Sequence, residues 1–112
     1  DTARTVTEML TVTLEEESFS NASVPGYSVA GKTGTAQIAE DGRYLENVTN
    51  TSFVGWGPSE DPKFLVYIWF ERPKSDTWGS TIAAPVFPPV FKELVRIGNI
   101  PPDDIRLQLT GK

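Results

Sequence analysis

The sequence predicts an α+β fold in which a three-stranded antiparallel meander is flanked by a helix before it and a helix after it. Strand-like segments rich in apolar and β-branched residues occur at about 29–39, 51–57 and 64–71, and apolar residues at helical spacing occur at about 2–16 and 80–97. The connections between the strand segments are too short for the crossovers that parallel strands need, so the meander must be antiparallel.

The first helix is expected over about residues 2–16. Asp1 or Thr2 can cap its N-terminus, and apolar residues recur on one of its faces: Val6, Met9 and Leu10. The acidic run at 15–17 opposes the helix dipole, so the helix either ends early or meets a basic neighbour. Residues 18–25 are expected to form a loop.

The strand at 64–71 is expected to be central, because residues 64–70 form an almost unbroken apolar run. The connector at 58–63 is short enough only for a hairpin. In contrast, residues 40–50 are expected to form a longer polar loop around Asp41 and Gly42.

The second helix is expected over about residues 80–97. Pro88 and Pro89 remove two amide donors from it, so the helix should kink or split near Phe87. Residues 101–112 are expected to be an extended tail. The chain is therefore expected to hold one domain over residues 1–100, followed by that tail.

The composition excludes several classes of function. The net charge of −5 disfavours a surface that attracts nucleic acid. The chain has no His and no Cys, so it lacks the usual zinc ligands, and we expect neither a metal nor a cofactor. It also has no apolar stretch of about 18 residues that could span a bilayer.

The most informative segment holds Lys32, Thr33, Gly34 and Thr35. Without His or Cys, hydroxyls, carboxylates, Lys and Arg must carry any acid, base or nucleophile role. On a strand, Lys32 and Gly34 would address one face, and Thr33 and Thr35 the other face or the edge. Because glycine lets a ligand backbone approach closely, the segment suits an acyl group or a carboxylate.

Residues 26–33 also match the phosphate-loop pattern of Gly, four residues, then Gly-Lys-Thr. A phosphate loop needs a buried strand before its first glycine and a helix after its last residues. Residues 18–25 supply no such strand, and Gly34 would fall in the first turn of the helix. We therefore reject nucleotide binding.

The chain resembles the C-terminal part of penicillin-binding protein transpeptidase domains, of the class B, monofunctional type. Five segments carry the resemblance in order: 25–37, 51–58, 61–62, 71–73 and 83–87. In that family Lys-Thr-Gly is the third active-site motif. The resemblance implies a partial penicillin-binding and β-lactamase-like fold, and cross-linking of peptidoglycan stem peptides by serine acylation.

The resemblance also implies roles for single residues. Lys32 would supply positive charge and take part in proton relay, and Thr33 and Thr35 would bind the terminal carboxylate of a D-Ala-D-Ala peptide or a β-lactam. The Thr35 amide would be an oxyanion donor, and Gly34 would keep that amide reachable. Further substrate contacts are expected from Gln37 on the strand and from Tyr44 on the expected loop at 39–50, which would rim the cleft.

Two other motifs of the family are missing, since no Ser is followed three residues later by Lys and no Ser-x-Asn occurs. We therefore expect a C-terminal segment of a longer enzyme that is inactive alone and whose partner is the remainder of its own domain. The alternative is a penicillin-binding-like domain that senses peptide or drug without turnover.

The family also implies a bacterial protein outside the cytoplasm, in the periplasm or on the outer surface, with a membrane-anchored parent. Because family sheets have five strands, the strand at 64–71 would lack a neighbour in this chain. An uncovered apolar edge predicts self-association of the isolated chain.

Overall fold

The computed structural model describes residues 1–16 and 20–109. The helices are α1 (Thr2–Glu16), α2 (Gly79–Ile82), α3 (Phe87–Ile97) and α4 (Asp103–Leu109), with short 3-10 helices η1 (Ser20–Ala22) and η2 (Ala84–Val86). The strands are β1 (Ala30–Glu40), β2 (Arg43–Gly57) and β3 (Phe64–Glu71). They form one antiparallel sheet in the order β1-β2-β3, which confirms the predicted α+β meander.

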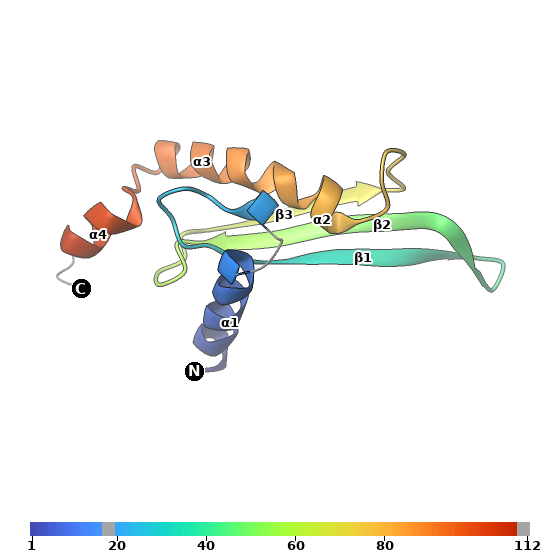
Figure 1. The fold of residues 1–112 in the computed structure, drawn as a ribbon, viewed down its shortest axis with the longest axis horizontal. Helices are drawn as coiled ribbons and strands as arrows, with labels where there is room; N and C mark the ends of the chain where they lie inside the picture. The colour runs from blue at the N-terminus through green and yellow to red at the C-terminus, as the bar shows by residue number, and fades with distance from the viewer. Residues whose placement is uncertain (17–19, 110–112) are drawn as a thin grey trace.

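Strands β1 and β2 form a long hairpin that extends beyond the helices (Figure 1). Its turn consists of Asp41 and Gly42, with φ values of 50° and 74°. Two consecutive positive φ angles give a turn whose twist matches the strands it joins. The polar loop expected at 40–50 is therefore wrong, because most of that segment belongs to the β1–β2 ladder.

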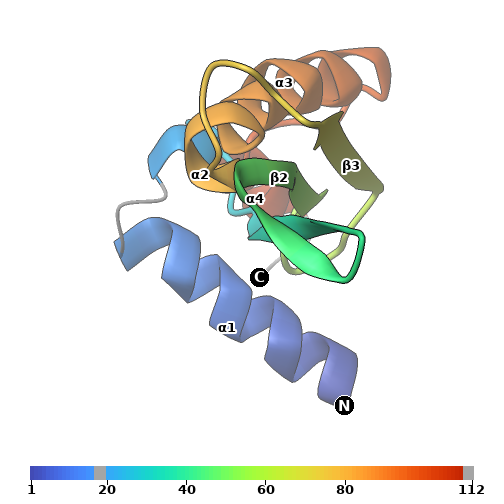
Figure 2. The ribbon, with the colours of Figure 1, turned by 90° about the vertical axis from the view of Figure 1, so that its right-hand side faces the viewer.

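Helices α2 and α3 cover one face of the sheet (Figure 2). Phe53 of β2 and Phe87 and Phe91 of α3 are fully buried there. The rings of Phe53 and Phe87 lie 5.2 Å apart, and those of Phe87 and Phe91 lie 5.4 Å apart. Gly55 makes this approach possible, because a Cβ atom at that position would lie 2.6 Å from the Phe87 ring. The aromatic cluster fixes α3 against β2.

Strand β3 is an edge strand among the described residues, so the expectation that it is central is wrong for this part of the chain. Its side chains on the face away from α3 are exposed: Leu65 by 66%, Tyr67 by 62% and Trp69 by 52%. The apolar run thus reflects one face packed on α3 and a second, uncovered apolar face.

Helix α1 packs against the start of β1 and ends at Glu16, as predicted. The apolar face expected for it is wrong in part, because Val6 and Met9 are exposed by 43% and 64%, whereas Thr11 and Leu14 are buried. Leu14 belongs to the core, and the Trp56 indole donates a hydrogen bond to Thr7 Oγ1 at 3.2 Å. Residues 17–19, which hold the last acidic residue of the run and the start of the expected loop, lie outside the described residues. The rest of that loop contains η1.

The second helix is interrupted as the prolines predict. It is divided into α2, η2 and α3, and the break lies at Phe87. Pro88 and Pro89 occupy the first turn of α3, where backbone amides have no partner within the helix. The two prolines therefore start α3 rather than distort its middle.

The extended tail expected over 101–112 is wrong for residues 103–109, which form α4. Asp103 and Asp104 lie in its first turn, where negative charge stabilises a helix, and Pro102 precedes it. Residues 110–112 lie outside the described part of the chain, and the division into a domain and a tail stays a prediction. No described helix is long and apolar enough to cross a membrane.

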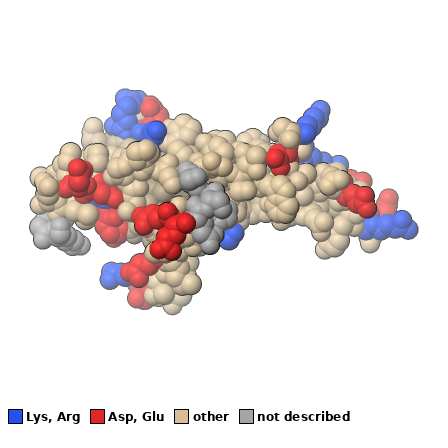
Figure 3. Space-filling view, in the orientation of Figure 1, with Lys and Arg blue, Asp and Glu red and all other residues tan. Residues whose placement is uncertain are grey.

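Charged side chains are mixed in sign on the face drawn in Figure 3, with Lys and Arg lying near Asp and Glu at both ends of the molecule. This mixture accompanies a net charge of −5.

Candidate functional site

Residues 32–35, called the 32–35 edge below, are extended along β1, an edge strand of the described sheet. Lys32 lies opposite Val54, Gly34 opposite Ser52 and Thr35 opposite Thr51. Gly31, Lys32 and Thr33 are all strand residues, whereas a phosphate loop would start a helix there. The geometry therefore rules out the nucleotide-binding alternative.

The Lys32 side chain lies along the edge of β1. Its Nζ donates to the Thr33 carbonyl oxygen at 3.0 Å and lies 3.4 Å from Thr33 Oγ1. The Thr33 carbonyl therefore points away from β2. Because the amide and carbonyl of one residue point to the same side in an antiparallel strand, and this direction repeats every second residue, the Thr35 amide also points away from β2.

The Thr35 side chain is held from the α2 side of the sheet. Its Oγ1 accepts a hydrogen bond from the Gly79 amide at 3.1 Å. A Cβ atom at Gly79 would lie 2.7 Å from the Gly34 carbonyl oxygen and 2.8 Å from that of Ser52. Only glycine lets the start of α2 rest on both strands, and the contact leaves the Thr35 hydroxyl hydrogen free to donate elsewhere.

The segment before Gly79 is fixed by hydrogen bonds of its own. Asp76 Oδ1 accepts from the amides of Thr77 at 2.6 Å and Trp78 at 3.1 Å. Thr49 Oγ1 of β2 donates to the Thr77 carbonyl oxygen at 2.8 Å. The segment that leads into Gly79 is therefore fixed to β2, which holds Gly79 at its contact with Thr35. No local pattern predicts this contact, because 44 residues separate Thr35 from Gly79 in the chain.

Of the two further predicted contacts, only Gln37 lies near the 32–35 edge. It is exposed, follows Thr35 by two residues and shares its face. Tyr44 is 69% exposed and lies opposite Ala39, four residues along β1 from Thr35, or about 13 Å at the usual strand rise. The structure therefore brings together residues 32–35 with Gln37, but places Tyr44 toward the end of the hairpin.

The strand leading into the site is anchored by α4. The Ser28 amide donates to Asp103 Oδ2 at 2.6 Å, and Arg106 binds both Asp103, at 2.7 Å, and Glu60. Burial alone would lower the pKa of Arg106, but the hydrogen bonds and charges of the two carboxylates outweigh burial and raise it. Through Asp103 and Arg106, α4 therefore connects Ser28, just before β1, to Glu60 in the turn between β2 and β3.

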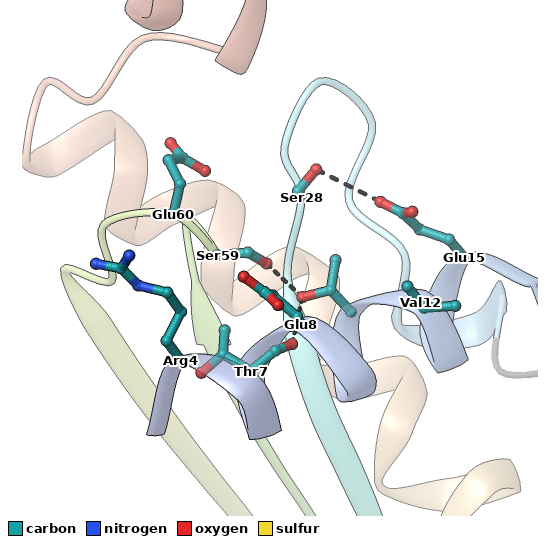
Figure 4. A pocket seen from close by; sticks show the side chains of 9 residues that line it. Arg4, Thr7, Glu8, Val12, Glu15, Ser28, Ser59 and Glu60 are labelled. Atoms are coloured by element: carbon teal, nitrogen blue, oxygen red, sulfur yellow. Dashed lines mark hydrogen bonds between the residues drawn. The ribbon is translucent and has the colours of Figure 1, made fainter. Parts of the chain in front are cut away.

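A separate pocket of about 530 Å³ lies between α1 and the segments at Ser28 and Ser59 (Figure 4). Within it Ser28 Oγ lies 3.4 Å from Glu15 Oε1, and the hydroxyls of Thr11 and Ser59 lie 2.7 Å apart. These four side chains thus contact one another in pairs, and none of residues 32–35 lines the pocket. The crevice beside Lys32 and Thr33 holds only about 10 Å³, so the 32–35 edge is an open wall rather than a closed cavity.

Among the described residues, no group of three or more Asp or Glu side chains is arranged to hold a metal ion. The 32–35 edge presents one ammonium group, two hydroxyls and a backbone amide that points away from β2. This set can bind an anionic group and stabilise negative charge that develops on an oxygen.

Comparison with known proteins gives a consistent result. A family model described as the penicillin binding protein transpeptidase domain matches residues 1–92. Stage V sporulation protein D of Bacillus subtilis is 39% identical over 94 residues, which are 83% of this chain and 15% of that protein. Peptidoglycan D,D-transpeptidase FtsI of Buchnera aphidicola is 39% identical over 84 residues, 73% of this chain and 14% of that protein. The chain thus spans about one seventh of the length of these relatives.

Solved structures agree with the sequence matches. The apo transpeptidase domain of Burkholderia pseudomallei penicillin-binding protein 3 superposes with a TM-score of 0.79 at 32% identity, covering 89% of this chain and 31% of that one. Mycobacterium tuberculosis penicillin-binding protein 3 complexed with ampicillin gives a TM-score of 0.72 at 29% identity, covering 88% and 24%.

Proposed function

This chain belongs to the penicillin-binding protein transpeptidase family, and we propose that its 32–35 edge forms one wall of the active site of a peptidoglycan D,D-transpeptidase. The observation that carries the proposal is the open edge of β1, with the Lys32 ammonium group on the Thr33 carbonyl and the Thr35 amide directed away from β2. Such an edge can take an extended peptide alongside it.

Lys32, Thr33 and Thr35 bind the end of the donor peptide. The two hydroxyls donate to the terminal carboxylate of a D-Ala-D-Ala stem peptide, or to the carboxylate of a β-lactam, and Lys32 supplies the positive charge. Gly34 adds no side chain between them, so the peptide backbone can approach the strand. Gln37 is the next side chain along the same edge and contacts the substrate further on.

The Thr35 amide stabilises the oxyanion. A serine hydroxyl attacks the carbonyl carbon between the two D-Ala residues, and the carbonyl oxygen becomes negative as the tetrahedral intermediate forms. The C–N bond then breaks, the terminal D-Ala leaves with a proton on its amine, and an ester joins the peptide to the serine. An amine of a second stem peptide attacks that ester, which forms the cross-link and returns the serine. One oxyanion donor is worth about 3 kcal/mol of barrier.

The serine belongs to polypeptide outside these 112 residues. No Ser in the chain is followed three positions later by Lys, and the chain covers only 15% of its sporulation-protein relative. The exposed face and the free outer edge of β3 are the surfaces on which the rest of such a domain packs. By the same family relation, the complete protein is bacterial, works outside the cytoplasm and is anchored to the membrane.

The experiment is acylation by a fluorescent penicillin. The complete protein should be labelled stoichiometrically, and Lys32→Ala should slow labelling by about 100-fold, because a charge that acts in the transition state is lost. The isolated chain should not be labelled. Stoichiometric labelling of the isolated chain, or a Lys32→Ala protein that reacts as fast as the wild type, would contradict the proposal.

A further inference from the structure

The hydroxyl of Thr51 is an exception in the core of this molecule. Thr51 is fully buried in β2, and its Oγ1 has no hydrogen-bond partner among the described residues. An unpaired buried hydroxyl is unfavourable, and such groups are few in folded proteins. A Val side chain of almost the same shape would avoid the penalty, so the presence of Thr at this position calls for an explanation.

Thr51 lies directly across the sheet from Thr35. The outward direction of the Thr33 carbonyl makes this pair one of those that exchange no backbone hydrogen bonds, and in such pairs the side chains come closest. Their Cβ atoms are expected about 4.5–5.5 Å apart on the same face, a spacing at which two Thr hydroxyls commonly bond. We therefore expect that a rotation about χ1 can bring the two hydroxyls within hydrogen-bonding distance.

The Thr35 oxygen has room for such a bond. A hydroxyl oxygen accepts two hydrogen bonds and donates one. The Gly79 amide already fills one acceptor position of Thr35 Oγ1. If Thr51 donates to the second, both lone pairs of Thr35 are taken, and its own hydrogen can only point to a further acceptor.

We propose that Thr51 is a positioning residue for Thr35: when an anionic ligand occupies the 32–35 edge, the Thr51 hydroxyl donates to Thr35 Oγ1 and directs the Thr35 hydrogen to the ligand's carboxylate. This inference rests on the proposed function, because it assigns the carboxylate to that edge. It also explains why a buried hydroxyl without a partner is retained beside Thr35.

The test compares Thr51→Val, Thr51→Ser and Thr35→Val in the complete protein, with fluorescent penicillin as the ligand. Thr51→Val should lower the second-order acylation rate constant about tenfold, the size of one hydrogen bond of average net strength. Its unfolding temperature should be equal to or higher than that of the wild type, because the unpaired hydroxyl is gone. Thr51→Ser should acylate at nearly the wild-type rate. In a Thr35→Val background, Thr51→Val should have no further effect on acylation.

Thr11→Val is the matched control, because Thr11 is also a buried Thr but lies in α1 and bonds to Ser59. It should lower the unfolding temperature and leave acylation unchanged.

The proposal is overturned if Thr51→Val acylates like the wild type, or if it slows acylation equally in the Thr35→Val background. If Thr51→Val does not fold, a crystal structure of the wild-type acyl complex decides: hydroxyl oxygens within about 3.0 Å support the proposal, and a separation beyond about 3.5 Å overturns it. A wild-type protein that is not labelled at all would contradict the proposed function instead.

Discussion

Gly79 is the residue at which the backbone of α2 comes closest to β1. In Gly79→Ala, the new Cβ atom would meet the carbonyl oxygens of Gly34 and Ser52 at 2.7 and 2.8 Å. Both are backbone atoms of the ladder and cannot turn aside. We expect a loss of about 2 kcal/mol in the free energy of unfolding, measured by chemical denaturation, together with slower acylation because the Thr35 contact is displaced.

Gly98→Ala is the matched control for this substitution. Its Cβ atom would meet Phe64 Cζ at 3.0 Å, the far end of a side chain that can turn, and the Leu94 carbonyl oxygen at 3.2 Å. We expect a smaller loss of stability and no change in acylation. A Gly79→Ala protein as stable and as reactive as Gly98→Ala would contradict the geometry of the α2 contact.

Tyr27 makes the stability of the fold sensitive to alkaline pH. Burial raises the pKa of its phenol, and the phenol donates to the Ile100 carbonyl oxygen at 2.6 Å. Because folding favours the protonated phenol, the stabilisation is fully present below the unfolded pKa of about 10 and is lost as the pH rises through the higher folded value. Denaturation curves should show this decline in the wild type and a weaker one in Tyr27→Phe. Equal slopes in the two proteins would show that Tyr27 is not the group responsible.

At the scale of elements, α4 holds the segment that leads into β1. Arg106 binds the carboxylates of Asp103 and Glu60 and the Pro101 carbonyl oxygen, and is itself largely buried. Arg106→Ala leaves two partly buried carboxylates without their cation, so we expect a loss of about 2 kcal/mol in unfolding free energy. Arg96→Ala, which removes an exposed pair with Glu93, should cost less than about 0.5 kcal/mol. Equal losses would contradict the role of α4.

The elements that the sequence predicted correctly are those with a clear local signal. Helix α1, strand β3 and the break at Phe87 followed from helical spacing, an apolar run and two prolines. The first half of β2 did not, because residues 43–48 extend beyond the core and are mostly exposed, so they show no alternation. In α4, Pro101 and Pro102 were interpreted as a tail, although proline followed by Asp103 and Asp104 is also typical of a helix start.

The candidate site was predicted in part for a similar reason. Residues 32–35 are contiguous, so their motif and its strand geometry could be inferred from the sequence alone. Gly79 lies beside Thr35 because α2 packs on the sheet, and Thr51 lies opposite Thr35 because of the strand register. Neither position is marked by a local pattern in the sequence. Tyr44 was expected on a loop, because the polar residues at 40–50 do not show the pattern of a strand. The hairpin is longer than expected, so Tyr44 lies on β2 toward the end of the hairpin.

Among the described residues, the outer edge of β3 and one of its faces are uncovered. Leu65, Tyr67 and Trp69 form an exposed apolar row on β3, and the backbone of β3 has no second neighbour among the described residues. Such an edge pairs readily with another copy. The isolated chain should therefore associate as its concentration rises, as sedimentation can measure, and Tyr67→Lys should weaken the association. A monodisperse monomer at high concentration would contradict this prediction.

A crystal structure of the complete protein acylated by a penicillin would show whether the 32–35 edge binds the acyl group and its carboxylate. We expect the acyl carbonyl oxygen about 3 Å from the Thr35 amide nitrogen, with the carboxylate at the hydroxyls of Thr33 and Thr35. An acyl group attached far from β1, or one whose carbonyl oxygen bonds only to other amides, would contradict it.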